Sequence, residues 1–163
     1  SAHCKHLFDR WCSSRRFCGT VIPQKRMAFE EPTQSAMSLT SEQKTLQEHR
    51  AGLKAAHRIM AGWGIEDADQ SRILDVDRNT LDSSEVFEAL TERQLVTISY
   101  LLNIHASLRE VFQNPENHLG FMTAANQNSP YFGRRPLDFV LTAEIDSLKK
   151  VCESLEQLKN GLW

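Results

Sequence analysis

Apolar residues recur at spacings of three and four along most of the chain after residue 40, which is the period of an amphipathic helix. The first stripe predicts a helix of about six turns. It begins after Thr40, whose hydroxyl forms a capping box with the Gln43 amide, and it ends at Gly62 and Gly64. Its apolar positions are Leu46, His49, Leu53, Ala56, Met60 and Trp63.

Two further stripes predict long helices in the second half of the chain. One runs over residues 91–112 with its apolar residues on one side, until Asn114-Pro115 ends it and begins the next helix. The other begins near Glu144 and carries the chain to Trp163. The apolar side of the first is formed by Leu95, Ile98, Leu101, Leu102, His105, Leu108, Val111 and Phe112. We expect His105 to be a hydrogen-bonded core residue rather than a catalyst.

Two short helices are expected between the long ones, over residues 67–74 and around residues 76–81. Joined by a tight turn, they have the length and apolar spacing of a helix-turn-helix. The candidate DNA contacts are Arg72, Arg78, Asn79 and Thr80. Residues 75–92 carry six acidic side chains and one Arg, which disfavours phosphate contact at this face.

The helical period fails from Thr123 to Pro136, where Asn, Ser, Pro and Gly gather. This stretch keeps two aromatic residues, Tyr131 and Phe132, and an arginine pair directly after them. An irregular loop of this composition is typical of a recognition surface. The alternative is a connection whose aromatic side chains fill the core.

The composition is that of an ordinary globular domain, with 40% hydrophobic and 25% charged residues over 163 positions. Since no apolar run approaches the roughly 18 residues that span a bilayer, we expect a soluble, cytoplasmic protein with no membrane partner. Phosphate-binding, dinucleotide-binding, zinc-protease and nucleophile-elbow motifs are absent from the sequence. We therefore expect an all-α helical bundle that acts as a binding module, with no catalytic residues and no cofactor.

The first 39 residues differ from the rest of the chain. Residues 1–27 carry six Lys or Arg and one acidic residue, whereas the other 136 residues carry 13 basic and 20 acidic ones. Cys4, Cys12 and Cys18 lack the close pairing of zinc ligands, so no metal is expected. We expect residues 1–39 to be a disordered basic leader, followed by an acidic body.

Several stretches of the body resemble one known family. Residues 101–116, then Asn126, then residues 132–138 are similar to the toxin-binding domain of Xre/MbcA/ParS antitoxins. Ile59 and residues 63–65, 73–76 and 79–81 resemble the degenerate Xre-type helix-turn-helix that precedes that domain. The resemblance divides the chain into a helix-turn-helix subdomain over residues 40–90 and a toxin-binding domain over residues 91–163.

The resemblance implies an antitoxin that forms an all-helical homodimer. Its partner is a RES-domain toxin, an enzyme that destroys NAD and whose active site the antitoxin covers. Operator DNA is a second candidate partner, through the helix-turn-helix. A stand-alone helix-turn-helix transcription regulator is the alternative hypothesis, and loss of promoter binding in Arg78→Ala would favour it.

The predicted toxin-binding residues are those that match the family's loop motif, together with apolar residues near residue 163. They are Asn126, Phe132, Gly133, Arg134, Pro136, Leu158, Leu162 and Trp163. Three positions depart from the family pattern: Phe121 stands where the family usually has Trp, and Asp75 and Ala143 stand where it has Gly. We expect Trp163 to enter a pocket on the toxin or to fold back on its own domain.

Overall fold

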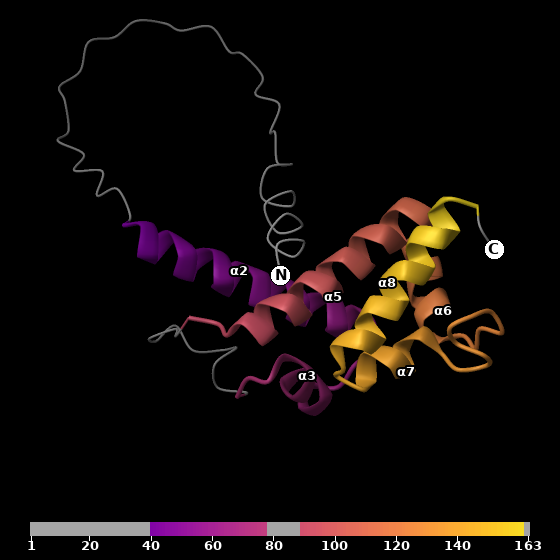
Figure 1. Cartoon of the computed structure of the whole chain (residues 1–163), viewed down its shortest axis with the longest axis horizontal. Helices are drawn as coiled ribbons and strands as arrows, with labels where there is room; N and C mark the ends of the chain where they lie inside the picture. Colours follow the sequence, from indigo (N-terminus) through magenta and orange to yellow (C-terminus); the bar gives the residue numbers. More distant parts are fainter. Residues whose placement is uncertain (1–39, 78–88, 162–163) are drawn as a thin grey trace, which may run out of the picture.

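The computed structural model describes residues 40–77 and 89–161, and all regular structure within these ranges is helical (Figure 1). This confirms the predicted all-α class for the described residues. The helices are α2 (Ser41–Gly62), α3 (Asp67–Leu74), α5 (Glu92–Val111), α6 (Pro115–Thr123), α7 (Pro136–Leu141) and α8 (Ile145–Lys159). The predictions for residues 1–39 and for residues 162–163 lie outside the described residues, as does all but the first two residues of the short helix predicted around residues 76–81.

Side-chain caps mark where α2, α5 and α6 begin. The Gln43 backbone N–H donates to the Thr40 hydroxyl at 3.3 Å, and the Thr40 N–H donates to the Gln43 side-chain oxygen at 3.0 Å, so the predicted capping box is confirmed. Thr91 and Gln94 form the same box at the start of α5. The α6 helix begins as predicted at an Asn-Pro pair, with the Asn114 side chain accepting from the Glu116 N–H.

The helices pack around α5. It contacts α2 and α3 on the N-terminal side of the chain and α6 and α8 on the C-terminal side. Helices α5 and α8 lie alongside each other in the same direction, since Cys152 approaches the Tyr100 carbonyl while Lys159 pairs with Glu110 near their last turns (Figure 1). The α7 helix contacts α8, α6 and α3, and so connects α3 with the helices of the second half of the chain.

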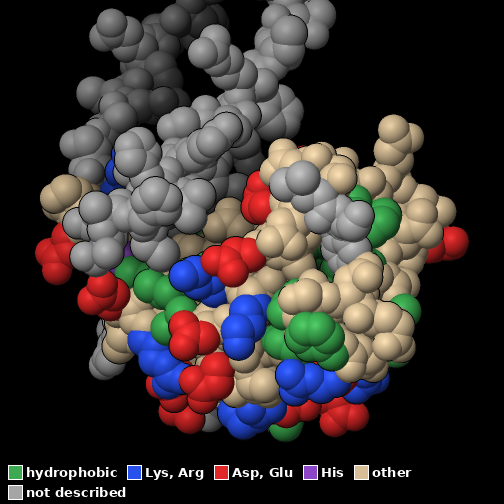
Figure 2. Space-filling view, turned by 45° about the vertical axis from the view of Figure 1, so that its right-hand side comes forward, with side chains coloured by type: hydrophobic (Ala, Val, Ile, Leu, Met, Phe, Trp, Pro, Cys, Tyr) green, Lys and Arg blue, Asp and Glu red, His purple; other side chains and the backbone are tan. Residues whose placement is uncertain are grey.

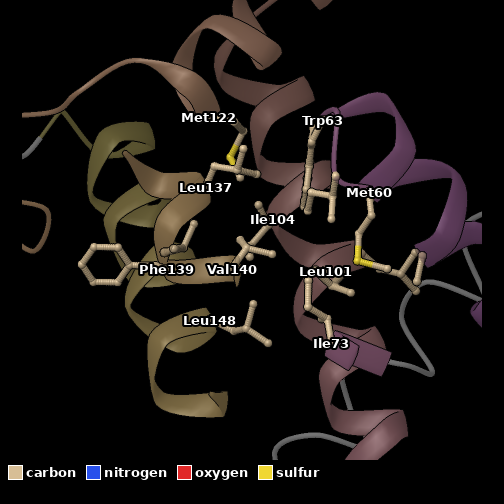
Figure 3. Close-up of a cluster of buried hydrophobic side chains, with 14 of the residues drawn as sticks. Met60, Trp63, Ile73, Leu101, Ile104, Met122, Leu137, Phe139, Val140 and Leu148 are labelled. Carbon is tan, nitrogen blue, oxygen red and sulfur yellow. The ribbon is translucent and has the colours of Figure 1, made fainter. Parts of the chain in front are cut away.

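Burial on α5 corrects the prediction of a one-sided apolar stripe. Figure 3 shows Leu101 and Ile104 of this helix among core side chains from α2, α6, α7 and α8. Several predicted stripe residues are only partly buried, namely Leu95, His105, Val111 and Phe112. In their place the helix buries Thr97, Ser99, Ile104 and Ser107. The physical reason is that helices cover α5 from more than one direction, so its buried surface is wider than one stripe.

Two features of the second half differ from the sequence prediction. The short helix α7 was not predicted; it begins with Pro136 in the first turn and with the Arg135 N–H donating to the Asp138 carboxylate at 3.0 Å. The last helix ends at Lys159 rather than continuing to Trp163. It stops because Gly161 takes a left-handed φ of 66°, with its N–H bonded to the Leu158 carbonyl at 3.2 Å.

None of the helices formed by residues 40–77 and 89–161 is both long and apolar enough to cross a bilayer.

Left-handed backbone occurs at two non-glycine residues that adjoin helices. Asp75 (φ 53°) ends α3, and Ala143 (φ 59°) lies just before α8. The Asp75 carbonyl accepts a hydrogen bond from the Gln94 side chain at 2.6 Å, and its carboxylate lies 3.9 Å from the Arg93 guanidinium. Both of those charged side chains are more than half exposed, so their pair contributes little to stability.

We predict that Asp75→Gly raises the free energy of unfolding by about 0.5–1 kcal/mol, because glycine adopts this conformation without a Cβ clash. The Gln94 bond to the backbone carbonyl remains in the variant. Ala51→Gly is the matched control, because Ala51 is exposed inside α2 and glycine there should cost about 1 kcal/mol. Denaturant unfolding measures both changes, and a loss of stability in Asp75→Gly would contradict the prediction.

Candidate functional site

The irregular stretch between α6 and α7 is a loop whose two ends are joined by backbone hydrogen bonds. The Asn126 N–H donates to the Arg134 carbonyl at 3.1 Å, and the Gly133 N–H donates to the Asn126 carbonyl at 2.7 Å. Inside the loop, the Asn126 side chain accepts from the Asn128 N–H at 3.0 Å, which forms an Asx turn. The residues between these points therefore form a closed, internally bonded turn.

Tyr131 anchors this loop to the core. Its side chain is 1% exposed and lies edge-on to Phe121 and Phe139, with ring centroids 6.3 and 5.3 Å away. Its hydroxyl is hydrogen-bonded to the Ser154 hydroxyl on α8. Burial raises the pKa of Tyr131 to about 12, so the phenol stays neutral over the physiological range.

Phe132 follows Tyr131 directly but points outward, with 75% of the residue exposed. Its backbone is left-handed at φ 47°, and Gly133 after it has a φ of 89°. A Cβ at Gly133 would meet only the Gln127 side chain, so space is available and the backbone conformation is what calls for glycine. The sequence placed both aromatic residues in one recognition loop; the structure buries one and exposes the other.

The two arginines after the turn have different environments. The Arg135 side chain donates to the Asp138 carboxylate at 2.6 Å, and these bonds hold the pKa of Asp138 below its usual value. The Arg134 guanidinium lies 4.4 Å from the centre of the Phe139 ring. Among residues 40–77 and 89–161, no carboxylate forms an ion pair with Arg134. Arg134 thus lies against a ring rather than bonded to a carboxylate, and its charge contributes, after that of Arg135, to the lowered pKa of Asp138.

Figure 2 shows the molecule turned by 45° from the view of Figure 1, so that the right-hand side of Figure 1 faces the reader. Hydrophobic side chains reach the surface there beside Lys and Arg side chains, with acidic side chains around them. Pro136, the last predicted loop residue, is buried in the first turn of α7. The structure therefore brings Asn126, Phe132, Gly133, Arg134 and Pro136 into one loop and its exit.

The predicted residues near the end of α8 form a separate group. Leu158 is half-buried and lines a surface hollow with Glu110, Val111 and Lys159. The Lys159 ammonium bridges two carboxylates at this end of the molecule. Its nitrogen lies 2.8 Å from a Glu110 oxygen and 2.7 Å from a Glu156 oxygen. Leu162 and Trp163 lie outside the described residues.

Of the predicted DNA contacts, only Arg72 lies among the described residues. Its guanidinium donates to Asp69 at 2.8 Å and to the Leu141 carbonyl at 2.9 Å, so it fastens α3 to the end of α7. Arg78, Asn79 and Thr80 are not described. Glu66, Asp67 and Asp69 at the start of α3 leave that end of the helix acidic, which is unfavourable for phosphate.

His105 corrects the prediction of a hydrogen-bonded core histidine. Its ring is partly buried and lies edge-on to His118, with centroids 6.3 Å apart. Within the described part of the chain, its Nδ1 is buried without a hydrogen-bond partner. Burial, with smaller contributions from Arg109 and His118, lowers the pKa of His105. The same ranges hold no group of three or more His, Cys, Asp or Glu that would suit a metal ion.

Comparisons with protein-family models, with curated proteins and with solved structures find no match to this chain. The loop residues and their geometry are therefore what supports a functional proposal. Sequence reasoning missed Ser154 as the partner of Tyr131, because nothing local marks a hydroxyl 23 residues away on another helix.

We predict that Tyr131→Phe lowers the free energy of unfolding by about 1 kcal/mol at neutral pH, through loss of the bond to Ser154.

We also predict that ionisation of Tyr131 makes the stability of the protein depend on pH in the alkaline range. The unfolded phenol ionises near about pH 10, whereas burial raises the folded pKa to about 12. The folded chain then holds more protons, so stability falls between these values in the wild type. Unfolding curves at pH 9 to 12 should show a shallower fall in the variant, and equal slopes would contradict the prediction.

Proposed function

We propose that this protein is the antitoxin of a type II toxin–antitoxin system and that it neutralises a RES-domain, NAD-degrading toxin by covering its active site. The observation that carries the proposal is the backbone conformation of the loop between α6 and α7. Three residues that match the antitoxin motif each fulfil a backbone requirement: Asn126 forms the Asx turn, Gly133 takes a φ of 89°, and Pro136 begins α7. The motif thus coincides with a folded, internally bonded loop, which supports a role in recognition.

Two positions outside the loop give further support. Asp75 and Ala143 stand where antitoxins of this family usually carry glycine, and both have left-handed backbone. Glycine is the residue that this conformation favours. Left-handed backbone at the end of α3 and before α8 is therefore what we expect of a chain from this family.

The proposal assigns the protein a binding role with no catalytic step of its own. In the described part of the chain, one loop carries the exposed ring of Phe132 and an arginine, Arg134, that forms no ion pair. Exposed aromatic and arginine side chains are typical of protein contacts. The stand-alone regulator is the weaker alternative, because Arg72 is held by Asp69 and the start of α3 is acidic.

Co-expression with the RES-domain protein encoded beside its gene tests the proposal. We expect restored growth and a complex that survives purification. Gly133→Ala should weaken neutralisation, because alanine strains the backbone at φ 89°. Gly120→Ala in α6 is the matched control, since a Cβ there meets nothing within 4 Å and the helix favours alanine. If the wild type gives no rescue of growth and forms no complex, the antitoxin proposal is refuted.

A second prediction concerns the residues after α8. Because α8 ends at Lys159 and Gly161 turns the chain, we predict that Leu162 and Trp163 contact the toxin rather than extend the helix. The double variant Leu162→Ala, Trp163→Ala should keep its melting temperature and bind the toxin about thirtyfold more weakly, the loss typical of a buried aromatic anchor. Full neutralisation with a lowered melting temperature would instead make Trp163 a packing residue of its own domain.

A further inference from the structure

Phe132 is the large hydrophobic residue that the described surface exposes most. It is 75% exposed, compared with 43% for Leu119 on α6. Its neighbour Tyr131 is 1% exposed and bonded to α8, so the two consecutive rings have opposite environments. Core packing does not explain the exposed Phe132, because Tyr131 already attaches this loop to the core.

The loop holds Phe132 in place. The Phe132 N–H donates to the Asn128 carbonyl at 3.2 Å, and Gly133 next to it is bonded to Asn126. The left-handed φ of 47° at a residue with a bulky side chain is a strained conformation, which occurs where the surrounding structure imposes it. A backbone held in this way loses little freedom on binding, which favours affinity.

The charged residues of the same loop indicate what kind of surface the Phe132 ring would meet. Arg135 is neutralised by Asp138, whereas Arg134 is stacked on Phe139 and, in the described ranges, has no ion pair. The residues after 27 are acidic as a whole, with 20 acidic and 13 basic side chains. An apolar ring with one available guanidinium complements an apolar pocket that has a carboxylate at its rim.

We infer that Phe132 and Arg134 form the anchor that docks this protein onto the toxin, and the inference rests on the proposed function. The Phe132 ring enters an apolar pocket on the RES-domain protein, and the Arg134 guanidinium pairs with a carboxylate at the pocket's edge. A second copy of this chain fits less well, since a two-fold contact between loops would bring two Arg134 side chains together.

Binding of purified variants to the purified RES-domain protein tests the anchor. We expect Phe132→Ala to raise the dissociation constant at least about thirtyfold, as truncation of a buried aromatic anchor does. Leu119→Ala, the matched control at the other exposed hydrophobic residue, should change it less than about twofold. Arg134→Gln should weaken binding and reduce its dependence on salt, because it removes one ion pair. None of the three should lower the melting temperature by more than a degree or two.

The outcomes separate the anchor from the function. If the wild type binds the toxin and Phe132→Ala binds equally well, the anchor is refuted while the antitoxin proposal stands. If the wild type does not bind, the proposed function fails and the anchor fails with it. Light scattering in the absence of toxin compares the molar masses of the wild type and Phe132→Ala. If the wild type is a dimer and the variant a monomer, the ring lies between copies of this chain and the inference is overturned.

Discussion

Helix α5 is the element on which the rest of the described structure depends, because it is buried from several directions at once. Helices α2, α3, α6 and α8 all contact it. A helix in this position must bury polar side chains too, and it does so with small hydroxyls. Thr97 and Ser99 donate to carbonyls one turn earlier in the same helix, at 3.0 and 2.8 Å. These internal bonds satisfy the hydroxyls without a partner on another helix, so the neighbouring helices can approach closely.

Helix starts were predictable from the sequence because side-chain caps act within a few residues. The Thr40 box and the Asn114-Pro115 pair are local signals, and both are confirmed. The α7 helix escaped prediction since six residues are too few for a helical period to show. The end of α8 was placed too late because apolar spacing continues to Leu162, whereas the backbone conformation of Gly161 stops the helix. Apolar periodicity reports burial and does not detect a glycine cap.

The loop was predictable in kind but not in detail. Failure of the helical period located it, and turn chemistry explains why Asn126 and Gly133 occupy their positions. No periodic pattern exists there to assign Tyr131 and Phe132 to opposite faces. Which of the two rings is buried depends on Ser154 and on the rings that enclose Tyr131, all of which come from other elements. The most informative feature of the candidate site is thus a tertiary property.

Three non-glycine residues in the described ranges adopt left-handed backbone, and they differ in what their side chains do. Asp75 adjoins a helix and makes only a long, exposed ion pair, while Ala143 adjoins another and has a single methyl group. Glycine at either position would keep every hydrogen bond of the backbone. At Phe132 glycine would relieve the same strain, of about 1–2 kcal/mol, but would remove the ring that the loop exposes. Backbone strain therefore disfavours phenylalanine at this position, and a ring that stays exposed gains little hydrophobic stabilisation to offset the strain. Contact with a partner would bury the ring and supply that missing stabilisation, which is why we propose that the exposed side of this loop serves binding rather than the fold.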